Sequence, residues 1–294
     1  MTASGRTPPL QQNMRDRYIW KLPRIPLELG NRTVIMGVLN VTPDSFSDGG
    51  LFLDRERAVE RGRELESQGA DILDIGGEST RPGNEPVSEE EELRRVLPVI
   101  ETLAARLQIP ISIDTYRSGV AKRAIEAGAQ IVNDISGLRF DSSLAGVVQS
   151  TGAGLVLMHS RGHRDEIHRQ TSVHDPVQSV IQGLEESLRT ARQAGILHPS
   201  IVIDPGIGFG KDAAASFKVL KSLSVFSKLR YPLLVGTSRK SFIRAIIQDS
   251  PELRLLGTAA TIASAIAGGA HAVRVHDVRE MRVVADVMDR ILLS

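Results

Sequence analysis

The segment TVIMGVLN (residues 33–40) is a short apolar run, rich in β-branched residues, that ends in the amide of Asn40. Seven further runs of this kind follow it, each ending in polar residues: ADILDIGGEST (70–80), IPISIDT (109–115), QIVNDISG (130–137), GLVLMHSRG (154–162), IVIDPGIG (201–208), YPLLVGTSRK (231–240) and HAVRVHD (271–277). Apolar runs of this length, bounded by glycine, proline and polar residues, are typical of buried strands. The sequence therefore predicts eight core strands.

The stretches between these runs have apolar residues at helical spacing. Examples are the series Ala58, Val59 and Leu65 before Gly69, the series Leu93, Val96, Leu97, Ile100, Leu103 and Leu107, and the series Val180, Leu184 and Leu188 before Gly195. A glycine just past such a series suits the left-handed conformation that often ends a helix. Eight strand–helix units in one chain predict a (β/α)₈ barrel, a closed parallel sheet with helices outside.

An open, doubly wound sheet is the alternative architecture, but the even spacing of the runs and the absence of a GxGxxG turn after the first strand favour the barrel. We expect one barrel domain over residues 31–294. Residues 1–30 are expected to form an N-terminal extension that is partly disordered or contributes a short hairpin. YIWKLP (18–23) and LELGNRT (27–33) would form this hairpin and close the bottom of the barrel.

The composition excludes several classes of function. The 294 residues carry a net charge of +1 with no basic block, so no nucleic-acid partner is expected. No apolar run is long enough to span a membrane, and the N-terminus has no signal-peptide core. The absence of cysteine excludes disulfides and thiol-bound metals. We expect a cytoplasmic protein.

The polar residues that end the eight runs should share one face, because parallel strands of a barrel end at the same rim. In chain order they are Asn40, Asp48, Thr80, Arg81, Asp114, Asn133, Asp134, His159, Arg161, Asp204, Lys240, Ser241, Arg274 and His276. Taken singly, each of them is somewhat more typical of a helix cap or a turn. Their number on one face is what predicts a binding site.

Two groups within this rim differ in chemistry. Carboxylate, amide and ammonium groups on Asp114, Asn133, Asp204 and Lys240 match the N–H donors and carbonyl of a flat heterocycle. Arg274 and His276, on the last strand, and Asn40, on the first, become neighbours when a barrel closes. They suit a phosphate, which often binds near strands 7 and 8 of such barrels.

Two motifs suggest other sites and are rejected. PGIGFGK (205–211) ends like a phosphate-binding loop but lacks its first glycine, and Asp212 replaces the required Ser or Thr. Its glycines instead predict a backbone that passes close to a ligand, with Phe209 covering it. The cluster His159, His163, His168 and His174 lacks an HExxH pattern, so HSRGHRDEIHRQ (159–170) is interpreted as an exposed loop rather than a zinc site.

The ordered set of motifs resembles the dihydropteroate synthases. MGVLNVTPDSFSDGG and GGESTRPG are similar to the two signature segments of that family, and SIDT, NDISG, MH, DPGIGFGK, GTSRKSF and RVHD follow in the family's order. The match runs from about Thr33 to the C-terminus. It implies a barrel enzyme of folate synthesis, a family that sulfonamides target. The enzyme would join 6-hydroxymethyl-7,8-dihydropterin diphosphate to 4-aminobenzoate and release pyrophosphate.

The resemblance also implies roles for individual residues. Those of the pterin site would be Asp114, Asn133, Met158, Asp204, Phe209 and Lys240. Asn40, Arg274 and His276 would hold the diphosphate, with Asn40 as a ligand of Mg²⁺, and Phe46, Thr80, Arg81 and Ser241 would contact 4-aminobenzoate. The catalytic residues would be Asp48, Asp114, Lys240 and Arg274. Members of the family are commonly homodimers, which this sequence does not show independently.

The chemistry expected from this assignment is dissociative. The electron-rich dihydropterin ring can stabilise a cation on its CH₂ group, so pyrophosphate would leave before the neutral amine attacks. Loss of pyrophosphate needs positive charge at the leaving group, and water must be excluded from the cation. NVTPDSFSDGG (40–50) is expected to act as a lid that carries Phe46 and Asp48 over this cation.

One segment departs from the family pattern, and two other functions compete with the one that the resemblance implies. Ser160 and Arg161 stand where the family often has Met and Gln, and this loop would border the pterin pocket. A methyltetrahydrofolate-dependent methyl transfer would need neither a diphosphate clamp nor the STRPG and SRKS segments. A pterin-binding barrel without activity would be expected to lack Lys240, Arg274 or the first loop, and all three are present.

Overall fold

The computed structural model describes residues 15–42, 50–78, 87–162, 174–248 and 250–294. Its centre is a parallel sheet of eight strands in the order β8-β7-β6-β5-β4-β3-β10-β9. The strands are β3 (Val34–Asn40), β4 (Ile72–Gly76), β5 (Ile111–Asp114), β6 (Ile131–Asp134), β7 (Gly154–Met158), β8 (Ile201–Asp204), β9 (Leu234–Val235) and β10 (Ala272–Val275). Each falls inside one of the eight predicted runs.

The two edges of this sheet meet and close it into a barrel. A parallel bridge joins Ile203 of β8 to Leu233, just before β9, and the Ile203 N–H donates to the Pro232 carbonyl at 3.0 Å. The predicted (β/α)₈ barrel is therefore confirmed, and the open doubly wound sheet is excluded. Within the sheet the last strand, β10, pairs with the first barrel strand, β3, and Arg274 is in register with Met36.

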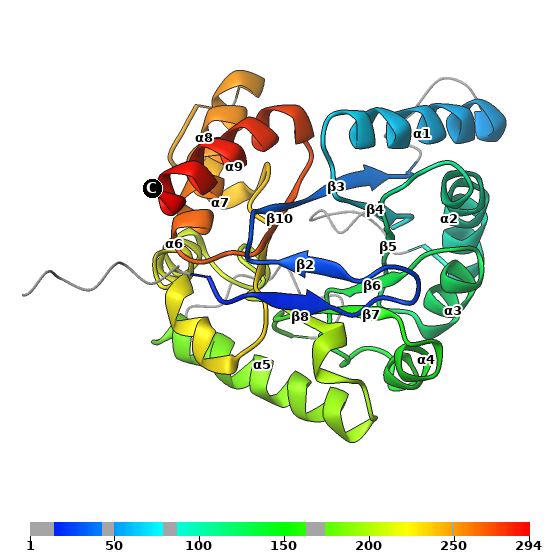
Figure 1. Cartoon of the computed structure of the whole chain (residues 1–294), viewed down its shortest axis with the longest axis horizontal. Helices are drawn as coiled ribbons and strands as arrows, with labels where there is room; N and C mark the ends of the chain where they lie inside the picture. Colours follow the sequence, from blue (N-terminus) through cyan, green and yellow to red (C-terminus); the bar gives the residue numbers. More distant parts are fainter. Residues whose placement is uncertain (1–14, 43–49, 79–86, 163–173, 249) are drawn as a thin grey trace, which may run out of the picture.

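Helices surround the barrel and cover its outer face (Figure 1). They are α1 (Gly50–Ser67), α2 (Glu89–Ala104), α3 (Ser118–Glu126), α4 (Leu144–Thr151), α5 (Pro176–Gln193), α6 (Ala213–Lys221), α7 (Ser241–Arg244), α8 (Pro251–Ala267) and α9 (Val278–Leu293), with 3₁₀ turns at His198–Ser200 and Leu223–Leu229. Local sequence sets their starts: Ser88 caps α2 through the Glu91 N–H, and Asp175 with Pro176 begins α5. No helix in the described part of the chain is long and apolar enough to cross a membrane.

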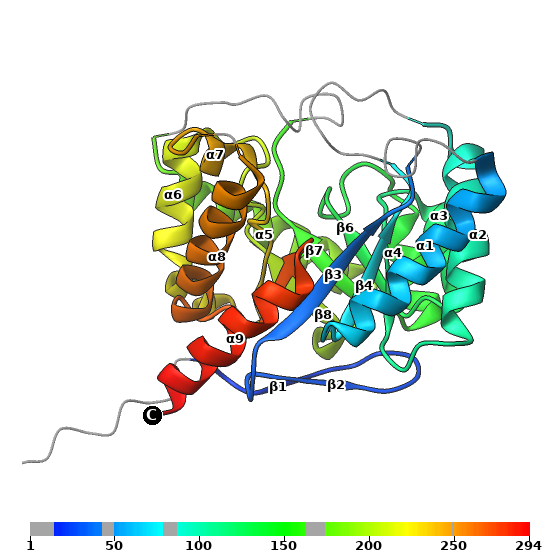
Figure 2. The ribbon, with the colours of Figure 1, turned by 90° about the horizontal axis from the view of Figure 1, so that it is seen from above.

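A hairpin covers the end of the barrel where the strands begin (Figure 2). β1 (Tyr18–Trp20) and β2 (Leu27–Leu29) pair antiparallel, as the sequence predicts. Trp20, Leu22 and Leu29 pack onto the lower interior of the barrel, formed by Val34, Met36, Ile72, Ile131, Val156, Val202, Leu234 and Ala272. The Trp20 indole N–H donates to the Ser200 carbonyl at 2.9 Å. The hairpin closes this end of the barrel, so a site can form at the opposite rim.

Candidate active site

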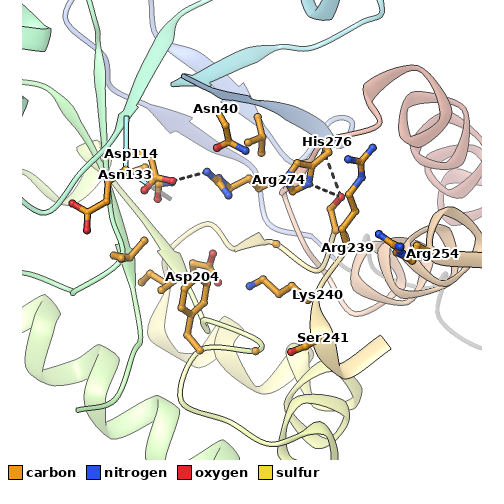
Figure 3. A pocket seen from close by; sticks show the side chains of 18 of the residues that line it. Asn40, Asp114, Asn133, Asp204, Arg239, Lys240, Ser241, Arg254, Arg274 and His276 are labelled. Carbon is orange, nitrogen blue, oxygen red and sulfur yellow. Dashed lines mark hydrogen bonds and ion pairs between the residues drawn. The ribbon is translucent and has the colours of Figure 1, made fainter. Parts of the chain in front are cut away.

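A cavity of about 470 Å³ opens at the rim where the barrel strands end (Figure 3). The structure brings most of the predicted site residues to its walls: Asn40, Asp114, Asn133, Met158, Asp204, Phe209, Lys240, Ser241, Arg274 and His276. Four others, Phe46, Asp48, Thr80 and Arg81, lie outside the described residues. The expectation that polar strand ends share one rim thus holds for these ten residues.

Arg274 of β10 lies between two carboxylates on one side of this cavity. Its Nε donates to Oδ2 of Asp74 at 2.6 Å, and its Nη2 donates to Oδ2 of Asp114 at 2.6 Å. Asn133 donates to the same Asp74 oxygen at 3.1 Å. The Asp74 side chain is fully buried, whereas 23% of the Arg274 side chain is exposed to the cavity. Arg274 is therefore held by the buried Asp74 and still exposes part of its side chain to the cavity.

The charged groups of this cluster shift one another's pKa values. Burial acts to lower the pKa of Arg274, but Asp74 and Asp114 outweigh it and raise the pKa, so the guanidinium stays charged. Burial raises the pKa of Asp114 to about 7, against the lowering effect of Arg274 and with a smaller raising effect of Asp74. Asp114 is thus a carboxyl group that titrates near neutral pH.

Asp204 and Lys240 face each other on another side of the cavity (Figure 3). Asp204 ends β8, and its Oδ1 accepts the Gly206 N–H at 2.7 Å. Burial raises the pKa of Asp204, which Lys240 partly offsets. Lys240 donates to the Ile207 carbonyl, and its Nζ lies 4.3 Å from the centroid of the Phe209 ring. Burial lowers the pKa of Lys240 to about 8, although Asp204 acts to raise it.

An apolar wall completes this part of the cavity. Tyr116, Ile135 and Met158 form a buried cluster against which Phe140 and Phe209 pack. Ile135, Met158 and Phe209 line the cavity itself. A wall of this kind beside a carboxylate, an amide and an ammonium can take a flat ring by its face while the polar groups hold its edge.

The opposite end of the cavity is rich in cations. Arg239 and Arg254 lie at this end, away from Asp114 and Asn133, and Lys240 and Arg274 lie between (Figure 3). Arg244 also lines the cavity, and His276 follows β10, which pairs with β3, the strand that ends in Asn40. The His276 Nδ1 lies 3.0 Å from the Ser238 hydroxyl, and Arg239 pairs with Asp277. This end of the cavity is suited to a multiply charged anion.

Sequence reasoning missed several of these residues. Asp74 stands inside an apolar run, and an isolated acid there was its only signal. Arg239 is part of the quoted run YPLLVGTSRK and directly precedes Lys240, so it could have been found. Arg254 begins no motif and comes from the first turns of α8, where an arginine is ordinarily a surface residue.

Two parts of the expected rim are corrected. Asp134 does not line the cavity, because its carboxylate accepts the N–H groups of Ser136 and Leu138 at 2.7 and 2.5 Å and shapes a turn. The segment that starts at His159 is not exposed at its beginning: His159 and Ser160 are only 6% and 5% exposed. His159 packs onto Gly183, where a Cβ would approach its ring to 2.5 Å.

Arg161 and Gly162, which are also among the described residues of that segment, do not line the large cavity. Arg161 donates to the Ser179 hydroxyl at 2.6 Å and lines a separate cavity with Arg139 and Glu186. His163 and His168 lie outside the described residues. Within the described ranges, no three His, Cys, Asp or Glu side chains are grouped as they would be around a metal ion.

Comparisons with known proteins agree with this geometry. Residues 36–276 match the model of the family described as pterin binding enzymes. A dihydropteroate synthase from Synechocystis is 47% identical over 261 residues, which cover 88% of this chain and 90% of that protein. A Clostridium difficile dihydropteroate synthase, solved with pteroic acid, has a TM-score of 0.85 and 45% identity, covering 90% of this chain and 98% of that one. The Xanthomonas albilineans enzyme, solved with 4-aminobenzoic acid, has a TM-score of 0.88 and 39% identity, covering 95% and 100%.

Proposed function

Because this chain belongs to the family of pterin-binding enzymes and acts as a dihydropteroate synthase in folate biosynthesis, we propose how its cavity performs that reaction. The substrates are 6-hydroxymethyl-7,8-dihydropterin diphosphate and 4-aminobenzoate, and the products are 7,8-dihydropteroate and pyrophosphate. The observation that carries the assignment of roles is that one cavity combines acceptors and an apolar wall at one side with a group of cations at another.

We assign the pterin to the side of the cavity formed by Asp114, Asn133, Asp204 and Lys240. The two carboxylates would accept N–H bonds from the pterin ring, and Asn133 and Lys240 would serve its carbonyl and ring nitrogens. Met158 and Phe209 would cover the ring faces. Because these polar groups are buried, leaving one unpaired costs roughly 1–3 kcal/mol, which favours the ring that pairs them all.

The diphosphate is assigned to Asn40, Arg274 and His276. Arg274 is already charged and anchored on Asp74, so no reorganisation is needed for it to meet an anion. Asn40 ends β3 and lines the cavity, and its Oδ1 lies beside Gly76, only 3.8 Å from where a Cβ on that glycine would stand. Asn40 therefore places an amide oxygen on the wall of the cavity beside β4.

A magnesium ion fits the donor set of this region. Mg²⁺ is commonly held by one or two protein oxygens together with substrate phosphates, and Asn40 supplies such an oxygen. Bound there, the ion would neutralise charge on the leaving diphosphate. The residues of this chain would orient the diphosphate and exclude water from the carbon that loses it.

The amine substrate is assigned to the mouth of the cavity beside Ser241. Ser241 begins α7 and lines the cavity, next to Lys240. By resemblance to the family, Phe46, Thr80 and Arg81 would also contact the amine substrate. Arg244 and Arg254 come from the same side and supply positive charge for a carboxylate.

The bond change proceeds in two steps. The bond between the pterin CH₂ group and the diphosphate oxygen breaks, and its electron pair leaves with the diphosphate. The lone pair of the aromatic amine then forms the new C–N bond, and the nitrogen loses a proton. Arg274 and His276 stabilise the leaving charge, while the Asp114 carboxylate, with Asp48 by resemblance, stabilises the cation.

The cation-rich end of the cavity separates this activity from a methyl transfer, which leaves no diphosphate. The direct test is pyrophosphate release by the purified protein with both substrates and Mg²⁺. We expect release that depends on the presence of both substrates. Absence of release at high enzyme concentration contradicts the proposal, and release of a methylated product from methyltetrahydrofolate would favour the rival.

A homodimer and a cytoplasmic location also belong to this proposal. α8 and α9 lie side by side (Figure 1) and expose large apolar side chains: Leu256, Val283, Val287 and Ile291 are 54–63% exposed. The three residues of α9 are spaced by four and form one stripe, which a second copy would cover. Light scattering should give twice the chain mass, and Val287→Asp should give the monomer mass. A monomeric wild-type protein contradicts the dimer.

A further inference from the structure

Lys211, the last residue of DPGIGFGK, has its amine buried beneath the turn that this segment forms. The residue is 3% exposed and does not line the large cavity. Its Nζ lies 2.8 Å from the Gly206 carbonyl oxygen, 3.1 Å from that of Phe209 and 3.0 Å from Nδ1 of His159. Carbonyls only accept, so the amine donates to both of them and ties the two ends of the turn together.

The turn needs such an anchor because of its backbone. Gly206, Gly208 and Gly210 have φ values of +61°, +83° and +60°, which L side chains rarely adopt. Within the turn, the Phe209 N–H donates to the Gly206 carbonyl at 3.1 Å. Gly206 also passes against the His159 carbonyl, where a Cβ would come within 1.8 Å. The turn is therefore pressed onto the end of β7 and secured there by Lys211.

What the turn presents to the cavity is functional. It carries the Phe209 ring and the Ile207 carbonyl, and Lys240 contacts both of them. A Cβ at Gly208 would come within 2.9 Å of the Lys240 side chain, so the turn and Lys240 are in close contact. A shift of the turn would move Lys240 and the covering ring at the same time.

We propose that Lys211 and His159 are positioning residues that hold the DPGIGFGK turn in the conformation that places Phe209 and Lys240 for the pterin. This inference rests on the proposed function of the cavity. Burial lowers the pKa of His159 to about 2, with Lys211 adding to the effect, so the imidazole is neutral and its Nδ1 can accept from the Lys211 amine.

The first test is Lys211→Met, with Lys221→Met as a control. Lys221 is an exposed lysine at the end of α6, so the control makes the same exchange away from the turn. We expect Lys211→Met to raise the KM for the pterin diphosphate at least tenfold. The KM for 4-aminobenzoate, at saturating pterin, should change less than twofold. Loss of folded protein alone would lower kcat without this division between the two KM values, and an unchanged pterin KM overturns the proposal.

A chemical rescue gives the second test, because the chain contains no cysteine. In Lys211→Cys the single thiolate attacks the CH₂ of 2-bromoethylamine in denaturant, a C–S bond forms and bromide leaves. The product has an amine at nearly the reach of lysine. Bromoethane gives the matched side chain without the amine. After refolding, we expect the aminoethylated protein to recover the wild-type pterin KM within about threefold and the ethylated protein not to recover it.

Equal pterin KM values for the two alkylated proteins would overturn the proposal, and if neither refolds, the Lys211→Met result decides. At the partner position, His159→Asn keeps polar atoms near Nδ1 and should impair pterin binding less than His159→Leu. The wild-type protein tests the proposed function separately from the role of Lys211. No pyrophosphate release from it contradicts the proposed function, whereas release combined with normal pterin binding by Lys211→Met contradicts only the role of Lys211.

Discussion

The Nε of Arg274 donates to Oδ2 of Asp74 at 2.6 Å, although the two residues are 200 positions apart in the chain. Asp74 lies within β4 and Arg274 within β10, and each pairs with one edge of β3. The Asp74 carboxylate is fully buried, and its other oxygen, Oδ1, has no hydrogen-bond partner in the described part of the protein. A buried charge placed in this way holds the arginine from below and leaves its remaining donors for the cavity.

Asp74→Asn should therefore impair catalysis, although Asp74 itself is not assigned a contact with a substrate. Removing one charge of a buried pair commonly costs about 3–5 kcal/mol, part of which appears here as a misplaced Arg274. We expect kcat/KM for the pterin diphosphate to fall by about 100-fold, which corresponds to about 2.7 kcal/mol. Steady-state pyrophosphate release measures this loss. A variant with wild-type kcat/KM would show that Asp74 does not position Arg274.

Asp204→Ala and Arg274→Ala should separate the two halves of the cavity. Without Asp204, buried pterin N–H groups lose their acceptor, so the affinity for the pterin should fall by roughly 1–3 kcal/mol whether or not it carries phosphates. Without Arg274, the affinity for the diphosphate form should fall far more than that for the form lacking phosphates. Calorimetry with both ligands on both variants measures the four affinities. Equal losses for both ligands in Arg274→Ala contradict its assignment to the diphosphate.

The pH dependence of kcat/KM should be bell-shaped. Asp114 must be ionised to accept N–H bonds, and its pKa is raised to about 7, so activity should fall as the pH drops below about 7. Lys240 must be protonated to donate, and its pKa is lowered to about 8, so activity should fall again above about 8. Lys240→Arg should keep the acid limb and lose the basic limb, because arginine stays charged. A basic limb that remains at the same pH in this variant would belong to another group.

The strands and the rim could be predicted from the sequence because both depend on local patterns. Each strand is a short apolar run, and each polar strand end falls on the rim by topology alone. The role of Asp74 could not be predicted because its partner is remote, and that of Lys211 because its contacts depend on the conformation of a turn. Arg274 follows Asp74 by 200 residues, and no spacing reveals that pairing. In the sequence Lys211 is only the end of a rejected phosphate loop, since a lysine beneath a glycine turn becomes visible only when the carbonyls around it are placed.

The burial of His159 could not be predicted from the sequence either. In HSRGHRDEIHRQ it stands among charged residues that suggest exposure, yet it is buried. Its burial depends on Gly183, which lies in α5 and leaves room for the imidazole. The many charged residues of this segment predict that it is exposed on average. A single residue just after a strand, such as His159, can still be buried.

His271 should make the stability of the barrel depend on pH. It lies at the closed end, where its Nδ1 accepts the Leu233 N–H at 3.1 Å and its Nε2 lies 3.0 Å from the Asp16 carbonyl oxygen. Because Nδ1 accepts, the ring is neutral and its proton is on Nε2. Burial lowers the pKa of His271 to about 4, against a raising effect of the Asp16 carbonyl.

The sign of the dependence follows from this lowered pKa. Between about pH 4 and 6.5 the unfolded chain binds a proton at this histidine that the folded protein does not bind, so the free energy of unfolding rises with pH. The contribution is fully present above about pH 6.5 and is lost as the pH falls toward about 4, and it amounts to about 3 kcal/mol. Urea unfolding of wild type and His271→Asn at pH 7.5 and 4.5 measures it, with His174→Asn, at an exposed histidine, as the control. The wild type and the control should lose about 2–3 kcal/mol more than His271→Asn on acidification. Equal losses in all three proteins would mean that His271 is already protonated in the folded barrel and that its bond from Leu233 does not fix its charge.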